Sequence, residues 1–212
     1  MLAGSQLLKG ARATERALKA LESPSILHVA THGFFLRSTQ QLARGSRGLV
    51  LVEQGAAAEV AEDPLLKAGL ALAGANGVPA DPEVDDGILT ALEALSLDLT
   101  GTQLVALSAC QTGVGEVTNG DGVMGLRRAL VLAGSATQLI SLWDVDDDAT
   151  ARLMESYYRS LLTGRSRRDA LQDAQLSLMG DPTYAHPRYW SAFLLSGDAS
   201  SLDAATLREL KN

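Results

Sequence analysis

The sequence predicts an α/β protein, a three-layer αβα sandwich with a mostly parallel sheet between its helices. Three observations lead to this fold class. Short apolar runs typical of buried strands recur along the chain, and segments with helical periodicity separate them. Strands separated by helices imply a mostly parallel sheet. Two of the apolar runs, Ile26–Ala30 and Leu104–Leu107, lead to His32 and Cys110, and open sheets carry their chemistry at the carboxyl ends of strands.

Composition restricts the classes of protein and of partner. The chain has 212 residues, enough for one large domain or two small ones with a substantial core. Its net charge of −7 argues against a nucleic-acid or anionic-membrane surface, and no segment has the apolar length needed to span a bilayer. The single cysteine excludes an internal disulfide and fits a reducing compartment. We therefore expect a cytoplasmic protein that binds neither nucleic acid nor membrane directly.

The first half of the chain begins with a predicted helix, whose apolar residues recur at helical spacing. Ser23-Pro24 ends it, because the residue before proline is pushed out of the helical region. The strand Ile26–Ala30 follows and leads to Thr31-His32-Gly33. The helix has its apolar positions at Leu7, Leu8, Ala11, Ala17, Leu18 and Leu21. Further predicted elements are two short strands or a hairpin over Gly45–Glu53 and Leu65–Ala73, a loop over Gly74–Asp86, and a short helix over Ile88–Leu95.

The second half alternates helices and strands more regularly. Its strongest helical pattern is Ala149–Leu162, where the apolar residues keep to one stripe and Asp147 or Asp148 can cap the first turn. The other predicted elements are the helix Asp121–Ala133 closed by Gly134, the strand Ala136–Leu142, the helix Arg167–Met179 with Ser166 as cap, and the strand Ser191–Leu195. We predict one domain over residues 1–198, followed by a polar C-terminal helix or tail over residues 199–212.

Cys110 and His32 are the candidate reactive pair. A free cysteine is more often a buried structural residue, so the thiol alone predicts nothing. A nucleophilic cysteine needs a neighbour that takes its proton, since a thiol of pKa about 8.5 is only a few per cent thiolate at neutral pH. His32 is placed to be that base, and the backbone N–H groups of Gly33 and Cys110 are candidates to bind a developing oxyanion.

Other patterns predict no metal or cofactor. His28 and His32 are four residues apart, as are helical zinc ligands, but Val29 and Thr31 favour a strand there. We interpret His28 as a hydrogen-bonded strand residue. The acidic run from Asp144 to Asp148 is explained by helix capping and solvation, and the glycines after Cys110 match neither a dinucleotide fingerprint nor a P-loop.

Seven blocks carry a resemblance to a known family, and they are ILHVATHGFF, DPLLKAGLALAGAN, DGILTALEALSLDL, LVALSACQTGVGE, GDGVMGLRRALVLAG, SLWDVDDDATARLMESYYRSLL and HPRYWSAFLLSGD. Together they run nearly end to end, and the chain resembles the CHAT domain family, caspase-like cysteine peptidases of the clan that holds separase, gingipains and metacaspases. The resemblance implies that His32 is the general base, that Cys110 is the nucleophile, and that the strand Ala136–Leu142 follows the cysteine strand in the sheet.

The resemblance also implies a substrate pocket and a partner. Trp143, Asp144 and Asp146 are expected beside the pocket for the residue before the cleaved bond, where carboxylates favour Lys or Arg. The alternative is that the acids from Asp146 onward cap the next helix and that Asp144 is solvated. Complete domains of the family begin further upstream, often after TPR repeats. We therefore expect missing first strands, an unpaired edge at Ile26–Ala30, and a TPR segment upstream or in trans.

Three functions stay open at this point. The leading one is a cysteine endopeptidase. The second is a catalytically inactive, caspase-like adaptor that binds partners, and the third is another cysteine hydrolase, such as an amidase, on a similar sheet.

Overall fold

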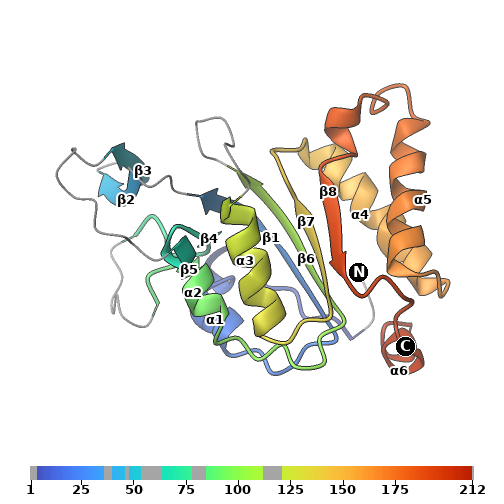
Figure 1. Ribbon diagram of the computed structural model, residues 1–212, viewed down its shortest axis with the longest axis horizontal. Helices are drawn as coiled ribbons and strands as arrows, with labels where there is room; N and C mark the ends of the chain where they lie inside the picture. The colour runs from blue at the N-terminus through green and yellow to red at the C-terminus, as the bar shows by residue number, and fades with distance from the viewer. Residues whose placement is uncertain are drawn as a thin grey trace.

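The computed structural model describes residues 4–35, 40–45, 48–53, 64–77, 85–111 and 121–211. Its centre is a six-stranded sheet in the order β5-β4-β1-β6-β7-β8, drawn in Figure 1. The strands are β1 (Ile26–Phe35), β4 (Ala68–Ala71), β5 (Ile88–Thr90), β6 (Leu104–Gln111), β7 (Thr137–Ser141) and β8 (Phe193–Gly197). A separate two-stranded sheet pairs β2 (Gln40–Gly45) with β3 (Gly48–Glu53). The predicted α/β class is confirmed.

The middle of the sheet is parallel and its two sides are antiparallel. β6 lies between β1 and β7 and pairs in parallel with both, as the resemblance implies for the strand that follows the cysteine strand. β4 pairs antiparallel with β1 over His32–Phe35, and β8 pairs antiparallel with β7. The first half of β1, Ile26–Ala30, is in register with β6 on one side and with no other described strand. The expected unpaired edge is therefore confined to that half.

Helices cover the two faces of the sheet unequally. On one face, α1 (Glu15–Lys19), α2 (Ala91–Ala94) and α3 (Asp121–Leu132) lie over a core that includes Val105, Leu107 and Ile140. On the other face, α4 (Asp147–Leu162) and α5 (Arg167–Met179) pack on Leu104, Ala106 and Leu139 (Figure 1). Each fully buried leucine contributes about 2 kcal/mol of transfer free energy. α4 and α5 therefore cover the β6–β7 half of this face, and α4 reaches β1 through the contact of Tyr158 with His28, but His28 and Ala30 stay exposed.

Two of the predicted helices differ from the observed elements. The long N-terminal helix is instead a 3-10 turn, Gly10–Arg12, followed by α1, because Gly10 takes a φ of +55° that a helix does not allow. The predicted helix Ile88–Leu95 is divided into β5 and α2. Thr90 causes the change, since its side chain accepts from the Glu93 N–H while the Glu93 carboxylate accepts from the Thr90 N–H. Remaining short elements are the 3-10 turns Pro64–Leu66 and Pro187–Tyr189.

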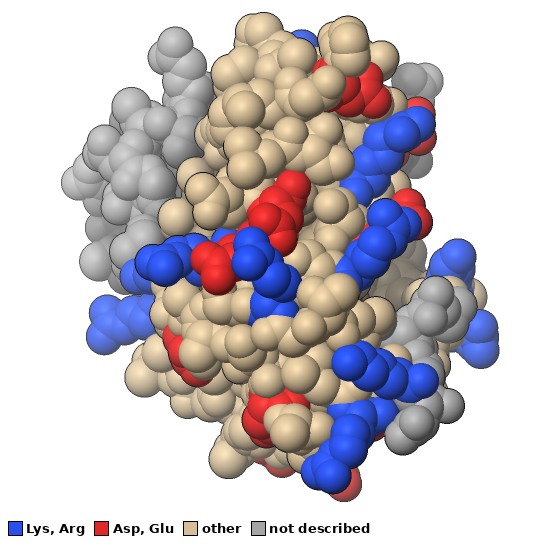
Figure 2. All heavy atoms as spheres, turned by 90° about the vertical axis from the view of Figure 1, so that its right-hand side faces the viewer, with Lys and Arg blue, Asp and Glu red and all other residues tan. Residues whose placement is uncertain are grey.

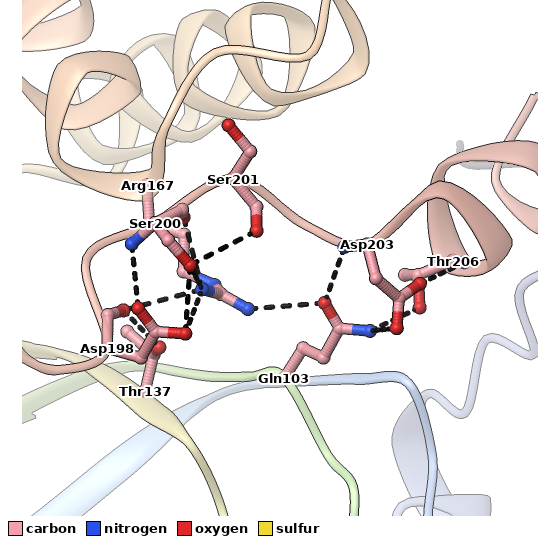
Figure 3. A network of polar contacts seen from close by, with 8 residues as sticks. All are labelled: Gln103, Thr137, Arg167, Asp198, Ser200, Ser201, Asp203 and Thr206. Atoms are coloured by element: carbon pink, nitrogen blue, oxygen red, sulfur yellow. Dashed lines mark hydrogen bonds and ion pairs between the residues drawn. The ribbon is translucent and has the colours of Figure 1, made fainter.

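The C-terminal residues are fixed to the main domain. The helix α6 (Ala204–Glu209) follows the buried Leu202, and both ends of this segment reach the same core as α4 and α5 through Leu202 and Leu210. Polar contacts around the buried Arg167 link it to the sheet, as Figure 3 shows. None of the helices in the described part of the chain combines the length and apolarity that a membrane crossing needs.

Candidate active site at the carboxyl ends of the central strands

The parallel ladder of β1 and β6 places His32 directly beside Cys110. The register pairs Ile26 with Leu104 and continues without interruption to His32 and Cys110. Neighbouring strands lie about 4.8 Å apart, so the two backbones are adjacent at this row. His32 is exposed. The sequence predicted that two reactive residues 78 positions apart (110 − 32) would lie together, and the register places their backbones side by side.

Burial along β6 decreases from Leu104 to Ser108, in the direction of this row. Leu104 to Leu107 are at most 1% exposed, whereas Ser108 is only partly buried. On β1, the exposed residues alternate with covered ones, and His28, Ala30 and His32 share the open face. Next to His32, the Thr31 hydroxyl donates to the Ala71 carbonyl and ties β1 to β4. At His32, β1 is therefore paired with β4 on one side and with β6 on the other, and the face that carries the His32 side chain is open to solvent.

His28 lies four residues before His32 on β1, and its side chain contacts β6 and α4. Its Nε2 lies 2.8 Å from the Ser108 hydroxyl on β6, and its Nδ1 lies 3.1 Å from the Tyr158 hydroxyl on α4. The imidazole and the Tyr158 ring are 5.7 Å apart, centre to centre. Although His28 is exposed at the surface, burial against these neighbours lowers the pKa of His28 below 6.5. The interpretation of His28 as a hydrogen-bonded strand residue is confirmed.

The expected oxyanion donors lie inside hydrogen-bonded ladders. Gly33 is in register with Leu70 of β4 and with Gln111 of β6, and Cys110 is in register with His32. A backbone N–H within a ladder points along the sheet toward a neighbouring strand. The oxyanion role of the Gly33 and Cys110 N–H groups stays a prediction, and these ladder positions count against it.

The expected pocket residues follow β7 on the segment that leads to α4. The Trp143 indole N–H donates to the Arg188 carbonyl at 3.0 Å, which fixes this ring against the 3-10 turn Pro187–Tyr189. Asp146 is the N-cap of α4 and accepts from the Ala149 N–H at 3.0 Å, as the capping alternative predicts. Asp144 is exposed. β7 ends at Ser141 beside β6, so the whole segment starts at the same sheet edge as Cys110.

Sequence reasoning missed two members of this region. Ser108 could have been found from the sequence. It lies two residues before Cys110, and residues two apart on a strand lie on the same face. Tyr158 lies in the apolar stripe of α4 and carries no local signal for a contact with His28. Among the described residues, no group of three His, Cys, Asp or Glu side chains is close enough to hold a metal ion. The glycine-rich loop after Cys110 and part of the predicted loop 74–86 lie outside the described residues.

A hollow of about 170 Å³ is lined by residues of α4, of α5 and of the segment that follows α5. Arg152 and Arg159 line it together with Glu155 and Asp181. Arg159 pairs with Glu155 at 2.7 Å, and the Arg152 guanidinium lies over the Tyr184 ring. Figure 2 shows basic and acidic side chains interspersed over this face. The charges of its lining balance, so this hollow offers no strong preference for an anion or a cation, and the sheet edge is the better candidate site.

Comparison with known proteins gives two findings. The sequence profile of the CHAT domain matches residues 1–198 of the chain. The chain is also similar to tetratricopeptide repeat protein 28 of Mus musculus and of Homo sapiens, with 30% identity over 205 residues in each case. These alignments cover 96% of the chain but only 8% of either relative, so the chain spans a small part of the length of the proteins it matches.

Proposed function

The chain belongs to the CHAT domain family, and from this premise we propose that it is a cysteine endopeptidase with His32 as general base and Cys110 as nucleophile. One observation supports the proposal most strongly, namely the register that sets His32 opposite Cys110 on adjacent parallel strands. Residues opposite each other in a parallel pair share a face of the sheet. The exposure of His32 leaves room for a peptide above that face.

The proposed chemistry is acyl transfer. His32 takes the proton of the Cys110 thiol, and the thiolate attacks the scissile carbonyl carbon of the bound peptide. The imidazolium then gives its proton to the leaving amine, and an acyl-enzyme thioester forms. Water attacks this thioester with His32 again as base, which releases the acid product and restores the thiol.

Specificity is proposed to come from the segment between β7 and α4. Asp144 and Asp146 are both exposed carboxylates of this segment, and a carboxylate beside the pocket favours a substrate Lys or Arg through a charge-assisted hydrogen bond. Asp146 contributes less to this preference, because its side chain accepts from the Ala149 N–H. Trp143 is held by Arg188 and provides an apolar wall at the same edge.

A TPR segment is the proposed partner of the domain. Both relatives are named tetratricopeptide repeat proteins, and the region similar to this chain is 8% of each. We propose that this chain likewise works together with TPR repeats, joined to it or supplied by another chain, and that its location is cytoplasmic.

The test compares a panel of fluorogenic peptides with a panel of small amides, using wild type and Cys110→Ala side by side. A peptidase cleaves the peptides, prefers those with Lys or Arg before the cleaved bond, and loses this activity in Cys110→Ala. Cleavage of the small amides alone identifies another cysteine hydrolase. Absence of turnover on both panels, with no labelling of Cys110 by a peptidyl chloromethyl ketone, identifies an inactive adaptor.

A further inference from the structure

The cluster of His28, Ser108 and Tyr158 lies next to the proposed catalytic row and has no role in the mechanism so far. Ser108 is in register with Ala30, which lies midway between His28 and His32 on β1. Ser108 thus has one imidazole on each of its two diagonals. The 2.8 Å contact with His28 shows that an imidazole on β1 reaches the Ser108 hydroxyl across one of these diagonals. Ala30, the residue between the two histidines on that strand face, carries only a methyl group.

The hydrogen bonds of His28 determine whether the Ser108 hydroxyl donates its proton to the imidazole or accepts from it. A neutral imidazole has one N–H donor and one acceptor nitrogen, so it donates to one of its two partners and accepts from the other. Burial favours this neutral form at pH 7, since it lowers the pKa of His28. Tyr158 is the titratable side chain of α4 in contact with the ring, and His32 is the titratable side chain on the same face of its own strand. When His28 Nδ1–H donates to Tyr158, its Nε2 accepts the Ser108 proton.

We propose that Ser108 is a positioning residue for the base: its oxygen accepts an N–H bond from the His32 imidazolium, and His28 and Tyr158 hold the hydroxyl in the orientation that leaves this oxygen free. The inference rests on the proposed function, because it concerns the state in which His32 has taken the thiol proton. A hydrogen bond to the charged form of a group favours that form. The cluster therefore stabilises the thiolate–imidazolium pair and lowers the pH at which Cys110 ionises.

Alkylation of Cys110 by iodoacetamide measures this ionisation without any peptide substrate. Cys110 is the one cysteine of the chain, so the intact mass reports its reaction unambiguously. The rate is followed from pH 5 to 10 in wild type, Ser108→Ala and Tyr158→Phe. Tyr157→Phe is the matched control, because it removes the neighbouring hydroxyl of the same helix, which is buried without a partner among the described residues.

The expected result is a higher titration midpoint in both cluster variants and an unchanged one in Tyr157→Phe. A midpoint higher by about one unit corresponds to alkylation about tenfold slower at pH 6 and equally fast at high pH. In Tyr158→Phe the shift has the same direction and is smaller, because the His28 proton is then free to move to Nε2 and donate to Ser108. If Ser108→Ala does not fold, which circular dichroism reveals, Tyr158→Phe decides the question, since it keeps the ring.

Each other outcome overturns the proposal. A midpoint that is unchanged or lower in Ser108→Ala means that the hydroxyl does not accept from the imidazolium. An unchanged midpoint in Tyr158→Phe means that Tyr158 and His28 do not orient the Ser108 hydroxyl. A wild-type thiol that does not react over this pH range means that the cluster does not promote ionisation of Cys110. Failure of the proposed function looks different, since the midpoints then shift as expected while peptides stay uncleaved.

Discussion

Arg167 offers the sharpest test of how the C-terminal segment is held. Its side chain is 2% exposed at the start of α5, and the guanidinium contacts acceptors on three residues. The shortest contact to each is the Asp198 carboxylate at 3.2 Å, the Ser200 carbonyl at 3.1 Å and the Gln103 side-chain oxygen at 3.2 Å (Figure 3). Arg167→Met keeps most of the apolar stem and removes the contacts to all three residues.

The loss of stability in Arg167→Met depends on which hydrogen bonds the acceptors keep after the change. The Ser200 carbonyl still accepts from the Arg167 backbone N–H, and the Gln103 oxygen still accepts from the Asp203 N–H. Asp198 has a side chain 52% exposed, so water solvates its carboxylate after the change. No acceptor is left buried and unpaired. The loss is two or three bonds from a charged donor at about 1.5–3 kcal/mol each, offset by the several kcal/mol of burying a guanidinium. We expect a net loss of about 2 kcal/mol in Arg167→Met, and about 4 kcal/mol in Arg167→Ala, which also removes the packed stem.

Urea denaturation followed by circular dichroism measures these differences. Arg165→Met is the matched control, because Arg165 binds Asp173 through two hydrogen bonds of similar length but is half exposed. Exposed ion pairs contribute little, so the control stays near wild type. Should Arg167→Met be no more destabilising than Arg165→Met, burial does not decide the strength of these contacts and the reasoning fails.

Three further predictions concern the region of the site. Asp146→Ala removes the α4 cap and lowers the free energy of unfolding by about 1 kcal/mol, whereas Asp146→Asn keeps the cap and stays near wild type in urea denaturation. The pKa of His28 is lowered in the folded state, so below pH 6.5 the unfolded chain binds more protons. Wild type therefore loses stability between pH 7.5 and 5.5, and His28→Gln loses less; equal losses refute this. Asp144→Asn lowers kcat/KM for peptides with Lys or Arg before the cleaved bond by roughly tenfold, about 1.4 kcal/mol, and changes apolar peptides little; an equal effect on both removes Asp144 from the pocket.

Elements with strong local signals were predictable from the sequence. The helix Arg167–Met179 has the predicted bounds, because Ser166 caps its first turn and its apolar positions keep helical spacing. Thr90 illustrates an element that was not predictable. It lies inside an apolar run that predicts one helix, but its capping box begins the helix only after β5 has ended. The antiparallel pairing of β4 with β1 was not predictable, because it depends on contacts that no local pattern encodes.

The candidate site likewise has features that the sequence predicted and features that it did not. The adjacency of His32 and Cys110 followed from two apolar runs that end in reactive residues, since parallel neighbours bring their carboxyl ends together. Tyr158 reaches His28 across 130 positions of sequence, a contact made by the packing of α4 on the sheet. For Asp146, local sequence left capping and substrate binding equally open, and the observed bond to Ala149 identifies the cap.

The central claim is that His32 and Cys110 act as one catalytic unit. Its most direct test measures kcat/KM on the best peptide of the panel for wild type, Cys110→Ala, His32→Ala and the double variant, with folding of each confirmed by circular dichroism. We expect each single variant to lose peptide cleavage and the double variant to be little worse than either, because members of one unit are not additive. Wild-type turnover in Cys110→Ala, or losses that multiply in the double variant, would contradict the claim.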